Sequence, residues 1–148
     1  FLLITGVLLY VSQRMNNGGI DQSNIGFKEA IIMGCGQAIA IMPGLSRSGT
    51  TIAAGLFSDL DKEFAARFSF LLSIPAILGA AWVQIKDIGA VDANIGAYIA
   101  GFIVAAISGY FAIKFLLKLI QEKSLDVFAY YCWIVGAIIL IGSFALGW

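Results

Sequence analysis

The sequence predicts an all-α integral membrane protein, and its composition and hydropathy pattern support this fold class. Of the 148 residues, 60% are hydrophobic and 12% are charged, whereas a soluble domain has roughly 45–50% and about 25%. Three apolar segments, at about residues 64–85, 95–117 and 127–146, are long enough to cross a bilayer as helices, which takes about 20 residues each. The net charge of zero indicates no nucleic-acid partner, so partners are expected in the membrane.

The chain opens inside an apolar run, residues 1–11, that is too short for a full span and lacks the basic region and cleavage site of a signal peptide. We therefore expect it to be the end of a fourth helix that begins outside this sequence. A polar, glycine-containing loop follows, at residues 14–24. Residues 1–148 are interpreted as one membrane domain, the C-terminal part of a longer protein.

Residues 27–57 do not fit a simple span, because their apolar run stops at Met42 and is broken by Pro43 and Gly44. A second short apolar run begins at Ile52. Neither arm can cross a bilayer alone, so the pattern predicts a re-entrant helical hairpin whose tip lines a cavity. The alternative is a single kinked helix that spans the membrane.

The distribution of Lys and Arg favours the hairpin, since a hairpin returns to the side from which it enters. The hairpin path places most basic residues on one side of the membrane, which the positive-inside rule makes cytoplasmic. The C-terminal Trp148 then lies outside. The basic residues on the rich side are Arg14, Lys28, Lys62, Arg67, Lys114, Lys118 and Lys123, and the other side has Lys86.

The predicted tip, residues 43–51, carries Arg47 among hydroxyl and glycine residues. A buried Arg costs roughly 2.5–3.5 kcal/mol at the centre of a membrane helix, which makes it a functional candidate. The acidic residues all fall near loops or helix ends, so Arg47 has no evident buried partner in this chain. A structural Arg paired with a carboxylate from elsewhere is the alternative.

A phosphate group suits this cluster for physical reasons. Gly44 and Gly49 allow close approach and positive φ, and a helix capped by Ser46 or Ser48 would point free N–H groups at an anion. Arg47 could donate two parallel hydrogen bonds to phosphoryl oxygens. Further hydroxyls would come from Thr50 and Thr51, although helix packing is an equal explanation for Thr50 and for Gly55.

Other catalytic chemistry is restricted by the composition. The chain has no His, so a Ser-His or Cys-His pair cannot be built from it alone. Cys35 and Cys132 lie in apolar stretches and have no metal-binding spacing. The acidic segment at residues 59–63 is interpreted as a solvated loop with a helix cap rather than a metal site.

The pattern Pro-Gly-x-Ser-Arg-Ser-Gly-x-Thr, formed here by Pro43, Gly44, Ser46, Arg47, Ser48, Gly49 and Thr51, together with the stretch at residues 65–75, resembles the bacitracin-resistance type undecaprenyl-diphosphate phosphatases. The resemblance covers the C-terminal half of that family. It implies a multi-pass enzyme of the bacterial cytoplasmic (inner) membrane that removes the terminal phosphate of undecaprenyl diphosphate. That reaction recycles the carrier lipid for peptidoglycan synthesis and confers bacitracin resistance.

The resemblance also implies residue roles and partners. Arg47 would hold the diphosphate, with Ser46, Ser48 and Thr51 as companions and with Gly44, Gly49 and Thr50 at the substrate. The family is built as inverted repeats with two re-entrant hairpins, an arrangement also found in transporters, and uses a divalent metal, magnesium or calcium. Expected partners are the lipid, the N-terminal half and a second copy in a homodimer.

This sequence departs from the family in one respect: the Glu-rich motif and the His of the N-terminal half are absent. The metal ligands and the acid-base group therefore have no place in this chain, and we expect the chain to be inactive alone. Two other functions stay open, namely a polyprenyl-phosphate or anion transporter and a purely structural membrane subunit, which would leave Arg47 unexplained.

Overall fold

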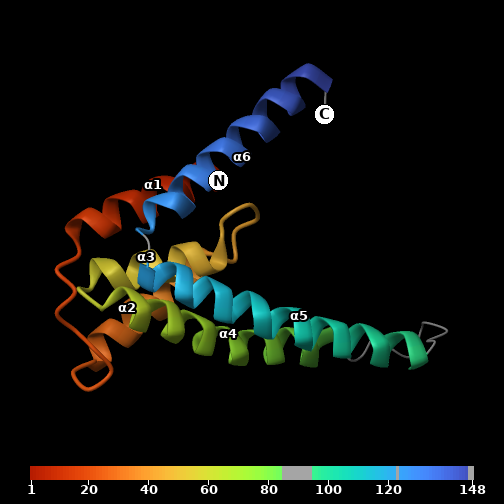
Figure 1. Ribbon diagram of the computed structural model, residues 1–148, viewed down its shortest axis with the longest axis horizontal. Helices are drawn as coiled ribbons and strands as arrows, with labels where there is room; N and C mark the ends of the chain where they lie inside the picture. Colours follow the sequence, from red (N-terminus) through yellow and green to blue (C-terminus); the bar gives the residue numbers. More distant parts are fainter. Residues whose placement is uncertain (85–94, 123, 147–148) are drawn as a thin grey trace.

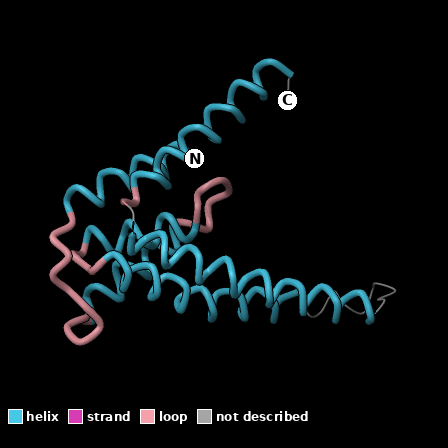
Figure 2. Tube along the Cα trace, in the orientation of Figure 1, coloured by secondary structure: helices cyan, strands magenta, loops and turns pink. Residues whose placement is uncertain are grey.

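The computed structural model describes residues 1–84, 95–122 and 124–146, and every regular element in these ranges is a helix. Figure 1 shows two arms that diverge from a common base, and Figure 2 shows the loops that join the helices at that base. The helices are α1 (Leu2–Met15), α2 (Phe27–Ile39), α3 (Arg47–Phe57), α4 (Lys62–Gln84), α5 (Ile95–Glu122) and α6 (Asp126–Leu146).

Three of these helices, α4, α5 and α6, are long and apolar enough to cross a membrane. They match the three predicted spans, which confirms a multi-pass membrane protein. The helix α5 extends five residues beyond the predicted end at residue 117, because the helix continues through a charged turn in which Lys118 and Glu122 lie 3.7 Å apart. The positions of Ile85, Lys86, Asp87, Asp92, Lys123 and Trp148 lie outside the described residues.

The helices α2 and α3 form a hairpin. Residues 40–46 separate them, and Gly36 of α2 faces Thr50 and Ala54 of α3 while Gly55 of α3 faces Met33 of α2, so the two helices run antiparallel. The alternative of one kinked helix over residues 27–57 is therefore wrong. With 13 and 11 residues, neither helix reaches the length of about 20 residues that a membrane span requires.

The loops before and after this hairpin are hydrogen-bonded to each other at the base. The N–H of Ile20 donates to the carbonyl of Asp59 at 3.0 Å, and the N–H of Asp61 donates to the carbonyl of Ile20 at 2.8 Å. The Asn16 amide, at the end of α1, donates to the carbonyls of Leu56 and Leu60 at 2.9 and 2.8 Å. Both ends of the hairpin therefore lie together, as a returning hairpin requires.

The first helix, α1, lies between the hairpin and α6 and packs against both. Its contact with α6 is close, since a Cβ added at Gly6 would lie 2.5 Å from Nε1 of Trp133. The same Trp133 Nε1–H donates to the carbonyl of Leu3 at 3.2 Å. At the other end of α1, Arg14 forms an ion pair with Asp126 at 3.4 Å. These contacts fix α1 along the side of α6.

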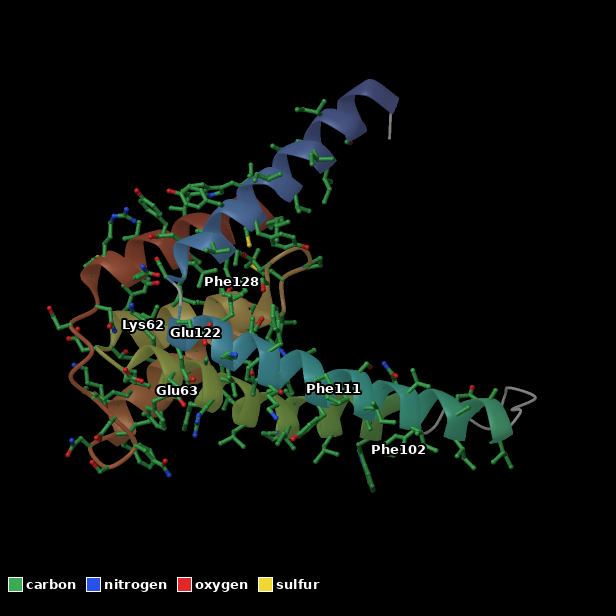
Figure 3. The ribbon with its side chains drawn as sticks, in the orientation of Figure 1. Lys62, Glu63, Phe102, Phe111, Glu122 and Phe128 are labelled. Atoms are coloured by element: carbon green, nitrogen blue, oxygen red, sulfur yellow. The ribbon has the colours of Figure 1, made fainter. Side chains whose placement is uncertain are left out.

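Large apolar side chains cover the outer surfaces of the long helices. Phe102 and Phe111 on α5 are 75% and 64% exposed, and Figure 3 shows them along the arm that α4 and α5 form. By contrast, Lys62, Glu63 and Glu122 lie at the base in the same view. Apolar arms and a charged base are the distribution expected when the arms lie in lipid and the base lies at the membrane surface.

Candidate functional site

The tip of the hairpin is a tight turn that depends on glycine. Gly44 has φ of +88°, a conformation that costs other L-residues about 1–2 kcal/mol. The N–H of Leu45 donates to the carbonyl of Met42 at 3.2 Å, which closes the turn before α3. The prediction of positive φ is confirmed at Gly44.

The same prediction is wrong for Gly49, which lies in the first turn of α3 and does not have a positive φ. A Cβ added at Gly49 would lie 2.6 Å from Cγ2 of Thr5 and 3.2 Å from Oγ of Ser46. Glycine is needed here because α1 passes directly against the start of α3. The sequence motif did not indicate that Gly49 lies against both Thr5 of α1 and Ser46 at the start of α3.

Ser46 is the residue that caps α3. Its Oγ accepts a hydrogen bond from the N–H of Gly49 at 3.2 Å, and its own N–H donates to Oγ1 of Thr5 at 3.2 Å. The first interaction is a standard N-cap, and of the two predicted caps Ser46 is therefore the one used. Thr5 was missed by sequence reasoning, since a single hydroxyl in an apolar run is a weak signal.

The cap leaves two backbone donors free at the start of α3. The N–H groups of Arg47 and Ser48 have no hydrogen-bond partner within the described ranges. Free N–H groups of this kind carry the positive end of the helix dipole and form a general binding site for anions.

Arg47 is the first residue of α3, so its side chain leaves the backbone in the same turn as these donors. Its side chain is exposed. The ion pairs found among the described residues are Arg14–Asp126, Arg67–Glu63 and Lys118–Glu122, and none includes Arg47. The alternative of a structural Arg paired with a carboxylate thus finds no partner in this part of the chain.

Next to the start of α3 lies a cavity of about 210 Å³ between α1, α3, α5 and α6. Ser46, Ser48 and Gly49 form its polar side. Its remaining walls are mostly apolar: Leu2, Leu9, Ile52, Leu116, Ile120, Leu125, Phe128, Tyr131 and Cys132. Arg47 is not part of this lining, so the first turn of α3 presents its serines to the cavity and its Arg to another side.

The two predicted threonines, Thr50 and Thr51, do not line this cavity. Thr50 is 6% exposed, and its Oγ1 has no hydrogen-bond partner. Thr51 is fully buried, and its hydroxyl bonds the carbonyls of Arg47 and Ser48 at 2.9 and 3.1 Å and also contacts the hydroxyl of Ser69. Direct contact of Thr51 with a ligand stays a prediction, and the observed bonds favour an internal, supporting role.

A metal site does not form from the side chains described here. In residues 1–84, 95–122 and 124–146, no three side chains of His, Cys, Asp or Glu gather closely enough to hold an ion. The described residues therefore do not by themselves form the divalent metal site that the resemblance implies.

Known proteins match almost the whole chain. An undecaprenyl-diphosphatase of Methanobrevibacter smithii is 67% identical over 144 residues, which are 97% of this chain and 52% of that protein. Proteins of the same name from Methanothermobacter thermautotrophicus and Methanosphaera stadtmanae are 58% and 53% identical over 97% and 99% of this chain, and over 81% and 53% of their own lengths. The chain thus spans about half the length of two of these relatives. The family described as bacitracin resistance protein BacA matches residues 1–138, and this chain belongs to that family.

Proposed function

We propose that this chain is the diphosphate-binding half of an enzyme that hydrolyses undecaprenyl diphosphate to undecaprenyl phosphate and inorganic phosphate. The observation that carries the proposal is the start of α3, where Arg47 forms no ion pair with the described residues and lies in the same turn as two backbone N–H groups that have no partner there. Relatives that are about twice as long carry the name of this activity. The active protein would therefore be longer than this chain, and it is called the full-length protein below.

The groups at the start of α3 suit a diphosphate. The two free N–H groups can donate to one phosphoryl group, and Arg47 can donate two parallel bonds to another. The hydroxyl of Ser46 accepts from Gly49 and still has its own proton to donate. Such preorganised donors lower the free energy of a phosphoryl group as charge shifts during transfer, which is the main contribution a protein makes to this chemistry.

The cavity beside the site supports a lipid as the carrier of the diphosphate. It is polar where Ser46 and Ser48 border it and mostly apolar elsewhere. A ligand with a charged end and a hydrocarbon chain matches this distribution, because each part would meet surface of its own polarity. A water-soluble diphosphate would gain nothing from the apolar walls.

We infer that the hairpin of α2 and α3 enters the cytoplasmic membrane from the base and returns to it. The hydrogen bonds between the loops at its two ends support this path, and the positive-inside rule makes the base cytoplasmic. The hairpin tip then lies at membrane depth, where an irregular backbone needs cover from protein or a water-filled cavity. The N-terminal half would supply a second such hairpin in an inverted repeat.

The N-terminal half would also supply the acid-base group and the ligands for magnesium or calcium, since the side chains described here do not form a metal site. A divalent ion neutralises charge on phosphoryl oxygens. The chain by itself is accordingly expected to bind diphosphate without hydrolysing it. Metal-dependent release of phosphate by the isolated chain would contradict this expectation.

The experiment compares phosphate release from undecaprenyl diphosphate by the full-length protein, with magnesium, before and after Arg47→Ala. We expect a loss of about 10²–10³-fold, the usual effect of removing one donor from a preorganised anion site. Arg67→Ala is the matched control, because Arg67 is also exposed but is paired with Glu63 on its own helix, and this variant should keep its activity.

Near-normal turnover by the Arg47→Ala variant, with folding verified, would make Arg47 structural and refute the proposal. Vesicles made with the same proteins test the transport alternative. Movement of labelled polyprenyl phosphate across the vesicle membrane without release of phosphate would replace the phosphatase with a transporter.

A further inference from the structure

The start of α3 is tied to the long helix α4 by a pair of buried hydroxyl groups. The hydroxyls of Thr51 on α3 and Ser69 on α4 are in hydrogen-bond contact. Thr51 is fully buried and Ser69 is 4% exposed. The neighbouring contact between the two helices is apolar, since Ala65 of α4 lies against Gly55. A hydroxyl in such surroundings costs free energy unless it is hydrogen-bonded.

The direction of these hydrogen bonds follows from counting protons. Each hydroxyl has one proton to donate. Thr51 directs its proton to the carbonyls of Arg47 and Ser48, at 2.9 and 3.1 Å. Its oxygen must then act as the acceptor for Ser69, so the chain of donation runs from Ser69 to Thr51 and on to the first turn of α3.

The end of this chain lies at the proposed phosphate site. The carbonyl of Arg47 and the N–H of Ser48 belong to the same peptide group, which is planar. Holding the carbonyl therefore also fixes the direction of the N–H, one of the two free donors at the start of α3. Consecutive hydrogen bonds polarise one another, so the Ser69 hydroxyl also strengthens that donor.

We propose that Ser69 is a positioning residue for the phosphate site, acting through Thr51 on the first turn of α3. This inference rests on the proposed function, since it assigns Ser69 a role at the same site. It adds a residue from α4 that touches none of the cavity described above and that the nine-residue motif does not contain. In this role Ser69 aligns the donors that hold the diphosphate and does not contact the diphosphate itself.

Ser73 provides a matched control for the test. It lies on the same helix, one turn further along, and is 9% exposed. Its hydroxyl donates to the carbonyl of Phe70 in its own helix at 2.6 Å. Ser69→Ala and Ser73→Ala thus remove the same group from similarly buried places, but only Ser69→Ala breaks a hydrogen bond to α3.

The test measures kcat and KM for undecaprenyl diphosphate, and the inhibition constant of inorganic diphosphate, on the full-length protein. Ser69→Ala is expected to raise KM and the inhibition constant together by about fivefold, the loss typical of one hydrogen bond. Ser73→Ala should change both by less than about twofold. Thr51→Val, which removes the hydroxyl at nearly constant shape, should match Ser69→Ala.

A double variant decides whether Ser69 acts through Thr51. If it does, Ser69→Ala combined with Thr51→Val should be no worse than either change alone, because both break one chain. Additive effects, or equal effects of Ser69→Ala and Ser73→Ala, would overturn the proposal. If Ser69→Ala fails to fold, Ser69→Cys takes its place, because it keeps a side chain of similar size and a weak donor. It should give an intermediate rise in KM. An unchanged KM would count against the proposal. Absence of turnover by the unmutated protein would overturn the proposed function, and this inference with it.

Discussion

The close contact between α1 and the start of α3 predicts that Gly49→Ala destabilises the protein and that Thr5→Ser restores much of the loss. The added methyl would lie 2.6 Å from Cγ2 of Thr5, in a place where Thr5 is fully buried. Thr5→Ser removes this methyl group and keeps the hydroxyl that accepts from the N–H of Ser46. The second change therefore opens space without breaking the hydrogen bond.

The magnitude can be worked from opposing effects. Forcing a methyl group into a packed site costs about 1–3 kcal/mol, and replacing Gly within a helix recovers roughly 0.5–1 kcal/mol. Taking the middle of each range, the net loss of unfolding free energy for Gly49→Ala is about 1 kcal/mol. Thr5→Ser alone should cost about 0.8 kcal/mol, the value of one buried methyl group. In the double variant the added methyl fills the space left at position 5, so the combined loss should be smaller than the sum of the two.

Thermal unfolding of the detergent-solubilised protein, followed by circular dichroism, measures these differences. Each 1 kcal/mol corresponds to a shift in Tm of about 2–4 °C for a protein of this size. An unchanged Tm for Gly49→Ala would refute the close approach of α1 to α3. A double variant whose loss equals the sum of the single losses would refute the assignment of the clash to the Thr5 methyl group.

Four further predictions can be checked by the same thermal scans. Gly36→Leu should lower the unfolding free energy by about 1–3 kcal/mol, because an added Cβ would lie 2.8 Å from Cβ of Ala54 in α3. Gly34→Leu should be nearly neutral, because nothing lies within 4 Å of a Cβ added there. Equal losses would contradict the hairpin packing. Gly44→Ala should cost about 1–2 kcal/mol because φ is +88°, and an unchanged Tm would contradict that turn. Asn16→Ala should cost about 1–3 kcal/mol of unfolding free energy, since it removes the side-chain donor to the carbonyl of Leu60 and one of the donors to the carbonyl of Leu56, and a neutral result would contradict those bonds. Inorganic diphosphate at about 100 times its Kd should stabilise the protein by about 2.7 kcal/mol; the Arg47→Ala variant should show a much smaller shift, and an equal shift in both would place the anion elsewhere.

The long helices could be predicted because their signal is local. About 20 apolar residues in sequence suffice to indicate a span, whatever the partners of that span are. The ends were less accurate, as in α5, because a helix continues through charged residues such as Lys118 and Glu122 when these lie one turn apart and leave the lipid. The hairpin was also a local signal, given by Pro43 and Gly44 between two short apolar runs.

The distribution of the site residues could be predicted only in part. The sequence places hydroxyls at four positions between Ser46 and Thr51, and the motif suggests that all face one ligand. Once α3 begins at Arg47, successive residues point about 100° apart around its axis. They therefore separate into Ser46 and Ser48 at the cavity, Arg47 on an exposed side, and Thr50 and Thr51 in the interior.

Contacts between distant segments could not be read from the sequence at all. Thr5 and Ser69 each contribute one hydroxyl to the start of α3, from positions 41 residues before Ser46 and 18 residues after Thr51. A single Thr or Ser in an apolar helix equally serves close helix packing. Only the folded arrangement shows that the two hydroxyls contact residues at the start of the same helix.

The charge arrangement at the tip gives the strongest reason to expect an anion there. Arg47 carries the same sign as the positive end of the α3 dipole and lies in the first turn of that helix. Stability alone would favour an acidic residue in this turn, and the first turn of α3 contains none. Placing a cation there instead lowers stability, because the two positive groups repel each other. A phosphoryl group reverses the sign of this interaction, because it meets both positive groups at once. The same arrangement that lowers the stability of the tip thus favours binding of an anion, as the proposed function requires.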